Sequence, residues 1–309
     1  MCTALHAHGC FGRTLDLEYG YAEQVVATPR DVTLAMRHLP ALTHHYAILG
    51  MATVAEGFPL YYDAVNERGL AMAGLHFPHS GRYAAASERV DNVASFELIP
   101  YILGKCADVD EAKGLLASLC ICDTAFSPDY PPTRLHWMVA DAKTSIVIET
   151  TAEGVRVYDN PIGAMTNEPT FDRQLTHWEG FSRLTAEEPS TTPPHLGRGS
   201  GSLGLPGDFT SPSRLVRAAF AAAHSEDDGD PVGQFFHLMA TVEVPRGCLR
   251  LPDGRYVTSR YTSCMDLGEP AYYYRTYGCA RIHGVRMVTA GAALVAFDLP
   301  HGENVKWEN

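Results

Sequence analysis

The sequence has 309 residues, of which 46 % are hydrophobic and 19 % charged, and its formal net charge is −12. These values are typical of a soluble globular protein with a sizeable core, and so acidic a chain excludes nucleic acid and anionic membrane surfaces as good partners. The first twenty residues lack a basic start followed by an apolar core, and no run of 18 apolar residues follows. We therefore expect a cytoplasmic protein without a secretory signal or a membrane span. Its eight scattered cysteines are expected to be reduced there.

The first half of the chain predicts a β-rich opening followed by two helices. Apolar or alternating runs of strand length predict strands at three ranges, which are 2–8, 46–55 and 70–75. A helix is predicted at 95–106, where Pro100 favours a kink or a late start because proline is disfavoured beyond the first turn. A second helix is predicted at 108–119, whose first turn is acidic, as the helix dipole prefers.

The second half predicts strands, then helices, then strands again. Strands are expected at 135–140, 145–150, 154–158, 256–264, 271–277 and 281–288, and helices at 211–224 and 232–241. The stretch 185–208 between them is rich in glycine, proline and serine, which predicts a long loop. This order of elements favours an α+β fold with antiparallel sheets over alternating βαβ units.

Cys2 is the first candidate for chemistry. A small second residue permits removal of Met1, which would leave Cys2 with a free α-amine. Such an amine has a pKa of about 7.7–8.0, so part of it is neutral at physiological pH and can take the proton of the thiol. Nucleophile and base then belong to one residue. A lone cysteine at position 2 has little specificity and is by itself better explained as an ordinary residue, so the downstream sequence has to decide.

Two charged residues follow close behind Cys2 in the sequence. Arg13 and Asp16 lie three positions apart. An arginine beside a thiol favours the thiolate, and an aspartate can hold an amine by a charge-assisted hydrogen bond. The alternative is an exposed ion pair, which is common and contributes little to stability.

Several motifs together resemble one known family. They are MCT at the start, GRTLDLEY (12–19), NERGLAMAGLHFP (66–78), LHWMVAD (135–141), MTNEPTFD (165–172), GLPGDFTSPSRLVRAAF (204–220) and YTSCMDLGEPAYYYRTY (261–277). In this order they are similar to the choloylglycine hydrolase family, which contains bile salt hydrolases and penicillin V acylases. The resemblance runs from residue 2 to about residue 288.

The resemblance implies a fold and an assembly. The expected fold is that of N-terminal nucleophile hydrolases, a four-layer αββα arrangement in which two antiparallel sheets pack face to face and helices cover both outer sides. A single domain would span 2–309. The loop at 185–208 resembles the segment that borders the site in the family and helps subunits assemble, so a homotetramer is expected.

The resemblance also implies roles for individual residues. Cys2 matches the nucleophile, with its α-amine as the base, and Arg13 matches the arginine beside the thiol. Asp16 matches the aspartate that holds the amine. Asn167 matches the asparagine whose NH₂ points at the oxyanion, and Arg214 matches the second arginine near the cysteine. From the residues alone, Asn167 is equally a turn residue before a proline.

Position 76 departs from the family pattern. Bile salt hydrolases have asparagine there and penicillin acylases tyrosine, whereas this chain has His76 in GLHFP. The backbone N–H of His76 can still serve an oxyanion hole, because any residue except proline supplies one. Its ring can donate a hydrogen bond or add a pH-dependent charge near the leaving group.

The implied reaction is hydrolysis of the amide bond of conjugated bile salts, which yields a bile acid and glycine or taurine and requires no metal or organic cofactor. A steroid acid needs a broad apolar pocket. Positions that resemble the family's pocket lining are Leu15, Tyr61, Tyr62, His76 and Phe126. Tyr61 and Tyr62 are equally compatible with an ordinary aromatic core.

Three alternatives remain open at this point. Penicillin V acylase and cleavage of N-acyl homoserine lactones would use the same machinery on smaller acyl groups. A non-catalytic metal-binding protein is a different class, suggested by His6 and His8 on one face of a predicted strand with Cys10 nearby. Two such histidines fall short of a closed zinc site, which needs a fourth ligand.

Overall fold

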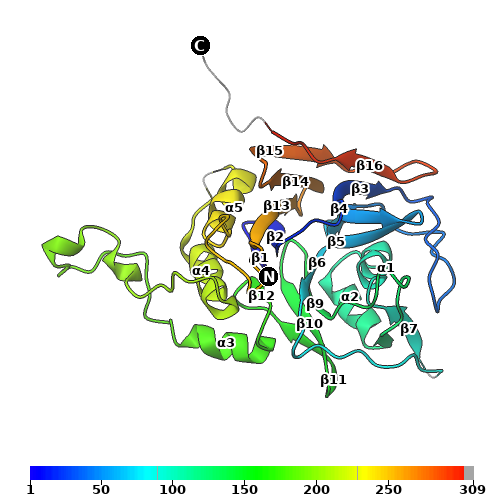
Figure 1. The fold of residues 1–309 in the computed structure, drawn as a ribbon, viewed down its shortest axis with the longest axis horizontal. Helices are drawn as coiled ribbons and strands as arrows, with labels where there is room; N and C mark the ends of the chain where they lie inside the picture. Colours follow the sequence, from blue (N-terminus) through cyan, green and yellow to red (C-terminus); the bar gives the residue numbers. More distant parts are fainter. Residues whose placement is uncertain (89, 228, 303–309) are drawn as a thin grey trace, which may run out of the picture.

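The computed structural model describes residues 1–88, 90–227 and 229–302, and its framework is a pair of large antiparallel sheets (Figure 1). Neighbours in the six-stranded sheet are, in order, β12 (Ala164–Thr166), β1 (Cys2–Ala7), β2 (Cys10–Leu17), β13 (Thr258–Asp266), β14 (Ala271–Thr276) and β15 (Cys279–Arg286). Those in the eight-stranded sheet are β11 (Gly154–Asp159), β10 (Ser145–Thr151), β9 (Leu135–Ala140), β6 (Ala71–His76), β5 (Phe58–Asn66), β4 (Ile48–Ala55), β3 (Gln24–Thr28) and β16 (Val295–Asp298).

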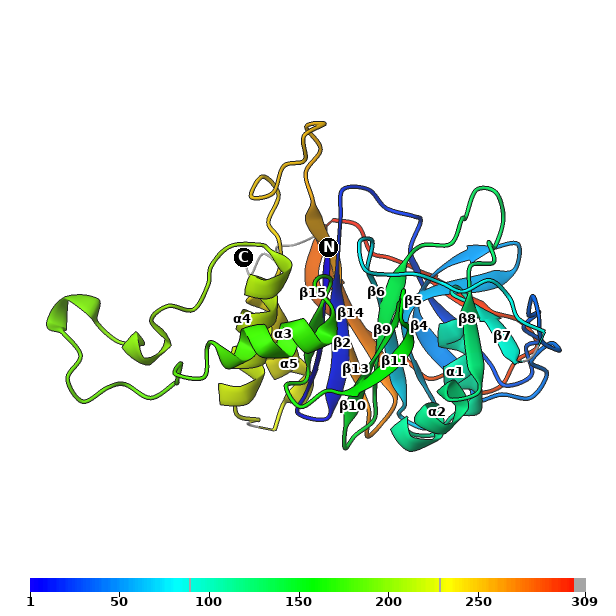
Figure 2. The same cartoon turned by 90° about the horizontal axis from the view of Figure 1, so that it is seen from below.

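Helices cover both outer faces of this pair of sheets (Figure 2). On the six-stranded side lie α3 (Phe171–Glu179), α4 (Ser211–His224) and α5 (Pro231–Ala240). On the eight-stranded side lie α1 (Leu98–Lys105), α2 (Val109–Leu116) and a small parallel pair of strands, β7 (Asp91–Ala94) and β8 (Leu119–Cys122). No helix among the described residues is both long and apolar enough to cross a membrane.

The molecule thus has four layers, which are helices, sheet, sheet and helices. Three layers of buried apolar side chains lie between them and hold them together. The middle layer, between the two sheets, contains Met51, Ala73 and Met138 from one sheet and Ala4 from the other. The outer layers pack the sheets on their helices, as Ile102 does on the eight-stranded side. Burial on both faces of each sheet fits the predicted four-layer αββα arrangement.

The predicted elements agree with the structure where the pattern was strong. The strand at 135–140 and the helix at 211–224 have the predicted bounds, and α1 begins at Leu98, close before Pro100. The sequence pattern did not predict the following elements, which are β2, β3, β5, β7, β8, β12, β16 and α3. Strands such as β2 are buried on both faces, so the alternation that signals a strand is lost.

The loop at 185–208 forms an extended arm that projects from the body, as Figures 1 and 2 both show. It contains two short 3₁₀ turns, Pro194–Leu196 and Ser200–Ser202. The single domain expected over 2–309 stays a prediction, and residues 89, 228 and 303–309 lie outside the described residues.

A two-residue turn sets the position of the first strand. His8 and Gly9 both have positive φ, at 52° and 71°, which is the conformation that tight β-hairpins require. The hairpin pairs Cys2 with Leu15. A slip of one residue would turn every side chain of the strand to the opposite face, so this turn helps to decide that the Cys2 side chain faces the other sheet.

Asn66 ties the end of β5 to the end of α1. Its side chain is fully buried, and its Nδ2 donates to the carbonyls of Leu103 and Cys106 at 2.7 Å each. Its Oδ1 accepts from the N–H groups of Arg68 and Leu70 at 3.0 Å each. One amide therefore satisfies four backbone groups where the sheet meets the helix.

Asn66→Ala is expected to lower the free energy of unfolding by about 2–3 kcal/mol, because it leaves buried backbone groups without partners. Urea denaturation measures this change. Asn92→Ala is the matched control, since the Asn92 amide is only half-buried and serves a local turn. Equal losses in the two variants would contradict the role given to Asn66.

Candidate active site

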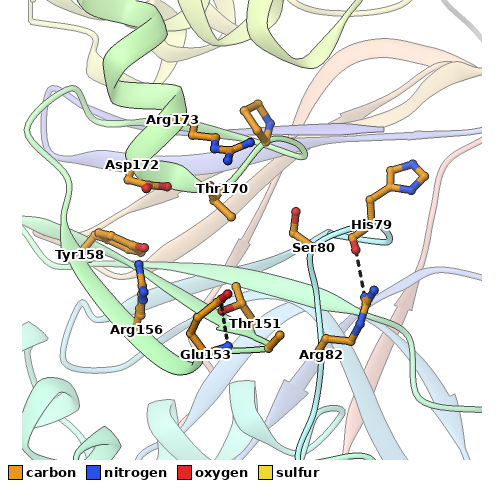
Figure 3. A pocket seen from close by; sticks show the side chains of 12 residues that line it. His79, Ser80, Arg82, Thr151, Glu153, Arg156, Tyr158, Thr170, Asp172 and Arg173 are labelled. Carbon is orange, nitrogen blue, oxygen red and sulfur yellow. Dashed lines mark hydrogen bonds between the residues drawn. The ribbon is translucent and has the colours of Figure 1, made fainter.

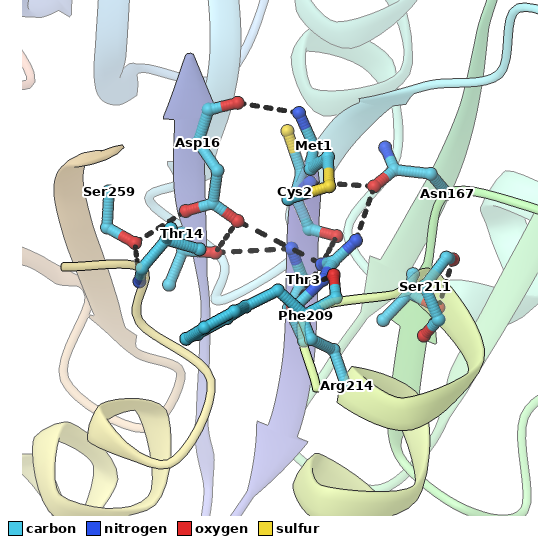
Figure 4. Close-up of polar contacts among 12 residues, drawn as sticks. Met1, Cys2, Thr3, Thr14, Asp16, Asn167, Phe209, Ser211, Arg214 and Ser259 are labelled. Carbon is cyan, nitrogen blue, oxygen red and sulfur yellow. Dashed lines mark hydrogen bonds and ion pairs between the residues drawn. The ribbon is translucent and has the colours of Figure 1, made fainter. Parts of the chain in front are cut away.

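Cys2 lies at the start of β1, inside the sheet rather than at its edge. The strand pairs with β2 on one side and β12 on the other, and the Cys2 side chain is buried in the middle layer. Met1 precedes it in this structure, and its amino nitrogen donates to the carbonyl of Asp16 at 2.6 Å (Figure 4). The polar groups that could act on Cys2 therefore come from the strands and the helix around it.

Arg13, on β2, is a buried cation beside Cys2. Its Nη1 donates to the Gly74 carbonyl at 2.7 Å and, more weakly, to that of Tyr62 at 3.4 Å, while Nε donates to the Thr14 carbonyl at 3.1 Å. Its Nη2 is buried and has no hydrogen-bond partner in the structure. Carbonyl groups thus hold the guanidinium while one NH₂ group stays free.

The electrostatics of Arg13 favour an anion nearby. Burial by itself lowers the pKa of Arg13, but the negative charges that Cys2, Tyr261, Asp63 and Asp16 can carry outweigh this effect and raise the pKa above its ordinary value. Cys2 is the strongest of these four. Arg13, whose Nη2 is free, is therefore a cation that can stabilise a thiolate at Cys2.

Asp16 has a carboxylate that is fully buried and fully engaged. It accepts hydrogen bonds from Ser259 Oγ at 2.6 Å and Thr14 Oγ1 at 3.1 Å, and its Oδ2 lies 3.9 Å from Arg214 Nη1. With Met1 in place, the Cys2 nitrogen donates to Asn167 Oδ1 at 2.7 Å instead. The predicted contact between Asp16 and a free α-amine stays a prediction.

Arg214, in the first turn of α4, reaches across to the start of β1 (Figure 4). Its Nη1 donates to the Cys2 carbonyl and to Thr3 Oγ1, and its Nη2 donates to Asn167 Oδ1 at 2.9 Å. Burial lowers the pKa of Arg214, and Asp16 and Cys2 oppose that effect. Arg214 therefore fixes the backbone of the first strand and the amide of Asn167 together.

Asn167 is oriented by these contacts. Because its Oδ1 accepts from both the Cys2 nitrogen and Arg214, its Nδ2 must point the other way, where it donates to the His76 carbonyl at 2.8 Å. An amide nitrogen carries two hydrogens, so one remains for a further acceptor. The structure thus brings Asn167 next to both Cys2 and His76.

His76 ends β6, and the pairing of that strand directs its backbone. The N–H of Phe77 donates to the carbonyl of Arg134, the residue just before β9, at 2.8 Å. Hydrogen-bonded residues alternate along an antiparallel ladder. The N–H and C=O of His76 therefore both point away from β9, toward Asn167, so a backbone N–H and the Asn167 amide lie on the same side.

The His76 side chain reaches solvent beside the amino terminus. Partial desolvation and the positive charge of that terminus lower the pKa of the His76 ring, although Glu168 opposes them. The ring is therefore neutral at pH 7 and adds no fixed charge to the site.

The structure separates the predicted pocket residues into two groups. Leu15 and Tyr62 belong to the middle layer with Cys2. Tyr61 and Phe126 lie in the layer between the eight-stranded sheet and its helices, where the Tyr61 hydroxyl pairs with Thr28 Oγ1 at 2.7 Å. Tyr61 and Phe126 are thus not brought together with Cys2, and Tyr61 fills an aromatic core position.

A β-bulge on β5 decides which of its residues shares a layer with Tyr62. Met51 and Ala52 are neighbours on β4, yet they pair with Asp63 and Tyr61, so Tyr62 is an extra residue on β5. A bulge of this kind re-aims the side chains around it. Tyr61 and Tyr62 face opposite layers, as successive strand residues do, but the bulge turns Asp63 to the same layer as Tyr62, which period-two alternation could not predict.

The histidines considered as metal ligands do not form a cluster. β1 ends at Ala7, so His8 lies in the turn, where its Nε2 is 2.7 Å from Ser225 Oγ. His6 is charge-coupled to Asp141, and burial lowers the pKa of its ring. Within the described ranges, no group of three His, Cys, Asp or Glu side chains is placed to hold a metal ion.

A surface pocket of about 430 Å³ lies where the β10–β11 hairpin meets the start of α3 (Figure 3). Its lining mixes charges of both signs, from Arg82, Glu153, Arg156, Asp172 and Arg173. None of the predicted site residues lines it. Two of its lining residues, His79 and Ser80, donate backbone N–H groups to the side chain of Glu168, which follows Asn167.

Comparison with known proteins identifies the family. The model of the linear amide C–N hydrolases, choloylglycine hydrolase family, matches residues 2–292. The chain belongs to this family. It is an enzyme of the class that hydrolyses linear amides.

Two curated members are similar over most of their length. A "Bile salt hydrolase/transferase" of Lactiplantibacillus plantarum is 41 % identical, over 93 % of this chain and 92 % of that protein. A "Bile salt hydrolase/transferase" of Clostridium perfringens is 35 % identical, again over 93 % and 92 % of the two chains.

Solved structures confirm the predicted α+β fold of N-terminal nucleophile hydrolases. The C2A mutant of the conjugated bile acid hydrolase from Clostridium perfringens superposes with a TM-score of 0.93 at 32 % identity, over 100 % of both chains. A penicillin V acylase from Agrobacterium tumefaciens gives a TM-score of 0.76 at 21 % identity, over 97 % of this chain and 92 % of that one. The second likeness concerns the fold alone.

The lowered pKa of His76 leads to a test. We expect the NMR titration midpoint of the His76 ring to lie below the ordinary histidine value of about 6.5, because partial desolvation and the nearby terminal charge both disfavour the protonated form. His76→Gln assigns the resonance. A midpoint above the ordinary value would contradict this account of the site.

Proposed function

We propose that this enzyme hydrolyses the amide bond of conjugated bile salts and releases a bile acid together with glycine or taurine. The observation that carries the proposal is the arrangement of polar groups around Cys2. The residue that becomes N-terminal when Met1 is removed meets a buried cation with a free NH₂ group, and its nitrogen contacts an oriented asparagine amide. The names of the relatives at 41 % and 35 % identity support the substrate class.

The proposed reaction begins with removal of Met1, which turns the Cys2 nitrogen into an α-amine. The amine takes the thiol proton, and the thiolate, facing Arg13, attacks the amide carbon to form a C–S bond. The carbonyl oxygen becomes an oxyanion, and we assign its stabilisation to two donors on one side of the site, the His76 N–H and the second hydrogen of Asn167 Nδ2. Such preorganised donors stabilise the transition state more than the bound substrate.

The tetrahedral intermediate then collapses. The C–N bond breaks, and the ammonium of Cys2 gives its proton to the departing amine, so the acyl group remains on sulfur as a thioester. Water, deprotonated by the same amine, attacks the thioester and restores the thiol. Every proton is passed between the α-amine, the sulfur, water and the leaving group, and no external cofactor enters the balance.

For the acyl side, we assign Leu15 and Tyr62 to contact with the steroid, because both lie in the middle layer with Cys2. The proposal leaves out Tyr61 and Phe126, which face the opposite layer.

We also propose that the enzyme acts in the cytoplasm as a homotetramer assembled through the arm at 185–208. The arm projects from the body, and Leu203 on it is 70 % exposed. Leu196, on the same arm, is 40 % exposed, so the arm offers more than one apolar side chain to another subunit.

A substrate panel tests the proposed activity. Glycocholate, taurocholate and penicillin V are incubated with the wild type and with Cys2→Ala, after intact mass has shown that Met1 is removed. We expect both bile salts to be cleaved by the wild type and none of the three by Cys2→Ala. Turnover by Cys2→Ala would refute the nucleophile, and cleavage of penicillin V alone would refute the substrate class.

Asn167→Ala tests the oxyanion donors separately. Losing one donor typically lowers kcat about 100- to 1,000-fold, so we expect a loss of that size with folding retained, measured on glycocholate. Asn160→Ala is a control, because the Asn160 amide is also buried but contacts only Met138 and Ala164 and the adjacent turn. A loss of kcat in Asn160→Ala equal to that in Asn167→Ala would show a merely structural effect.

A further inference from the structure

Asp63 is a buried carboxylate to which the reaction described above gives no role. It lies on β5, is fully buried, and faces the middle layer because of the bulge at Tyr62. Its Oδ1 accepts a hydrogen bond from the Tyr272 hydroxyl and its Oδ2 one from the Tyr261 hydroxyl, both at 2.6 Å. Both tyrosines belong to the opposite sheet, so this single carboxylate joins the two sheets at mid-layer.

The contacts of Asp63 indicate that it is ionised. Burial, followed by the charge of Asp63, raises the pKa of both Tyr261 and Tyr272 well above the ordinary tyrosine value, so both keep their protons and donate them. A distance of 2.6 Å is typical of a hydroxyl that donates to a charged oxygen. Burial raises the pKa of Asp63 above its ordinary value, and Arg13 and the hydroxyls of Tyr261, Tyr272 and Ser263 oppose that effect without cancelling it, so the two short hydroxyl contacts are the observation that indicates the ionised form.

Arg13 lies between this carboxylate and Cys2. Its Nε is 4.0 Å from Asp63 Oδ2 but donates to the Thr14 carbonyl, so Asp63 acts on the guanidinium through charge and not through a hydrogen bond. The buried Nη2 of the same cation has no hydrogen-bond partner among the described residues, and Cys2 is the group whose negative charge would act most strongly on Arg13. One buried positive charge thus serves two groups that can be negative.

We propose that Asp63 is a positioning residue that acts on Cys2 through Arg13, as the second anion that shares this guanidinium. When Cys2 is a thiol, Asp63 is the counter-ion that lets Arg13 remain buried. When Cys2 is a thiolate, Asp63 competes for the same cation and limits how strongly the thiolate is favoured. This inference rests on the proposed role of Cys2 as nucleophile.

The other charged groups around Cys2 are already engaged with one another. On β2, the Asp16 carboxylate is held by two hydroxyls and faces Arg214 of α4. At the end of β6, His76 is neutral near pH 7 for the reasons given above. The terminal amine is the remaining titrating group, and it is unchanged in a variant at position 63. Tyr261 and Tyr272 also face Asp63, but their raised pKa values keep them protonated, so a change of charge at Asp63 should reach Cys2 chiefly through Arg13.

The test is the pH dependence of Cys2 alkylation by iodoacetamide, with Asp63→Asn compared with the wild type. Modification is quantified on the N-terminal peptide by mass spectrometry, because the exposed Cys248 also reacts. We expect the pH midpoint to fall by about one pH unit, since removing a like charge near an ionising group favours its charged form. An unchanged or raised midpoint would overturn the proposal.

Glu149→Gln is the matched control. Glu149 is also a fully buried carboxylate of the eight-stranded sheet, but it contacts His136 and the N–H of Phe171. We expect this variant to lose stability with no shift of the alkylation midpoint. A shift equal to that of Asp63→Asn would show that any buried-charge loss moves the midpoint, and would refute a specific role for Asp63.

Tyr272→Phe is the second variant, should Asp63→Asn fail to fold. It keeps the carboxylate but removes one of its two hydroxyl donors, which favours the protonated form of Asp63, so we expect a smaller downward shift. A shift in the other direction would contradict the proposal. Because alkylation needs no substrate, these outcomes are independent of the substrate panel, and failure of the proposed function would appear there and not here.

Discussion

Two fully buried guanidinium groups, one on each side of the first residues of β1, constrain the whole active centre. A buried cation is strongly unfavourable unless its N–H groups find acceptors and its charge finds a partner. Arg214 meets this requirement with the Cys2 carbonyl, Thr3, Asn167 and the carboxylate of Asp16. Arg13 meets it with backbone carbonyls of two strands and the nearby charge of Asp63. The first strand is placed where it satisfies both.

Much of this arrangement could be predicted from the sequence. Arg13 and Asp16 follow Cys2 closely in the sequence. One hairpin turn between Cys2 and Arg13 is enough to bring the three residues together on neighbouring strands. Strongly patterned elements such as α4 were predicted with their bounds. Asn167 and Arg214 are more than 160 residues away from Cys2 in sequence, so no local signal could place them. Only the resemblance of several motifs to one family pointed to them.

The remaining features depend on tertiary structure. Ser259 reaches Asp16 across 243 positions of sequence, and nothing in the strand around it marks it out. The bulge on β5 is a second case, because an alternating pattern assigns Tyr61 and Asp63 to one face, whereas the extra residue sends them to opposite faces. Tyr61 had been placed among pocket residues by the family resemblance, and the sequence offered no sign that Asp63 faces the same layer as Cys2. A shift of pairing by one residue decides that Asp63, and not Tyr61, faces the layer that contains Cys2 and Arg13.

The position of β1 has a practical consequence for handling the enzyme. The strand begins inside a sheet, with neighbours on both sides, so the chain's beginning is as confined as an interior segment. An affinity tag, a display anchor or a linker to a solid support fused at that end would keep the Cys2 nitrogen in a peptide bond and crowd the surroundings of Asn167. The tip of the projecting arm at 185–208 lies far from that confinement in both views (Figures 1 and 2). The tip of the arm is therefore an attachment point that leaves the reacting end free, but a support fixed there would cover the surface to which we assign subunit assembly.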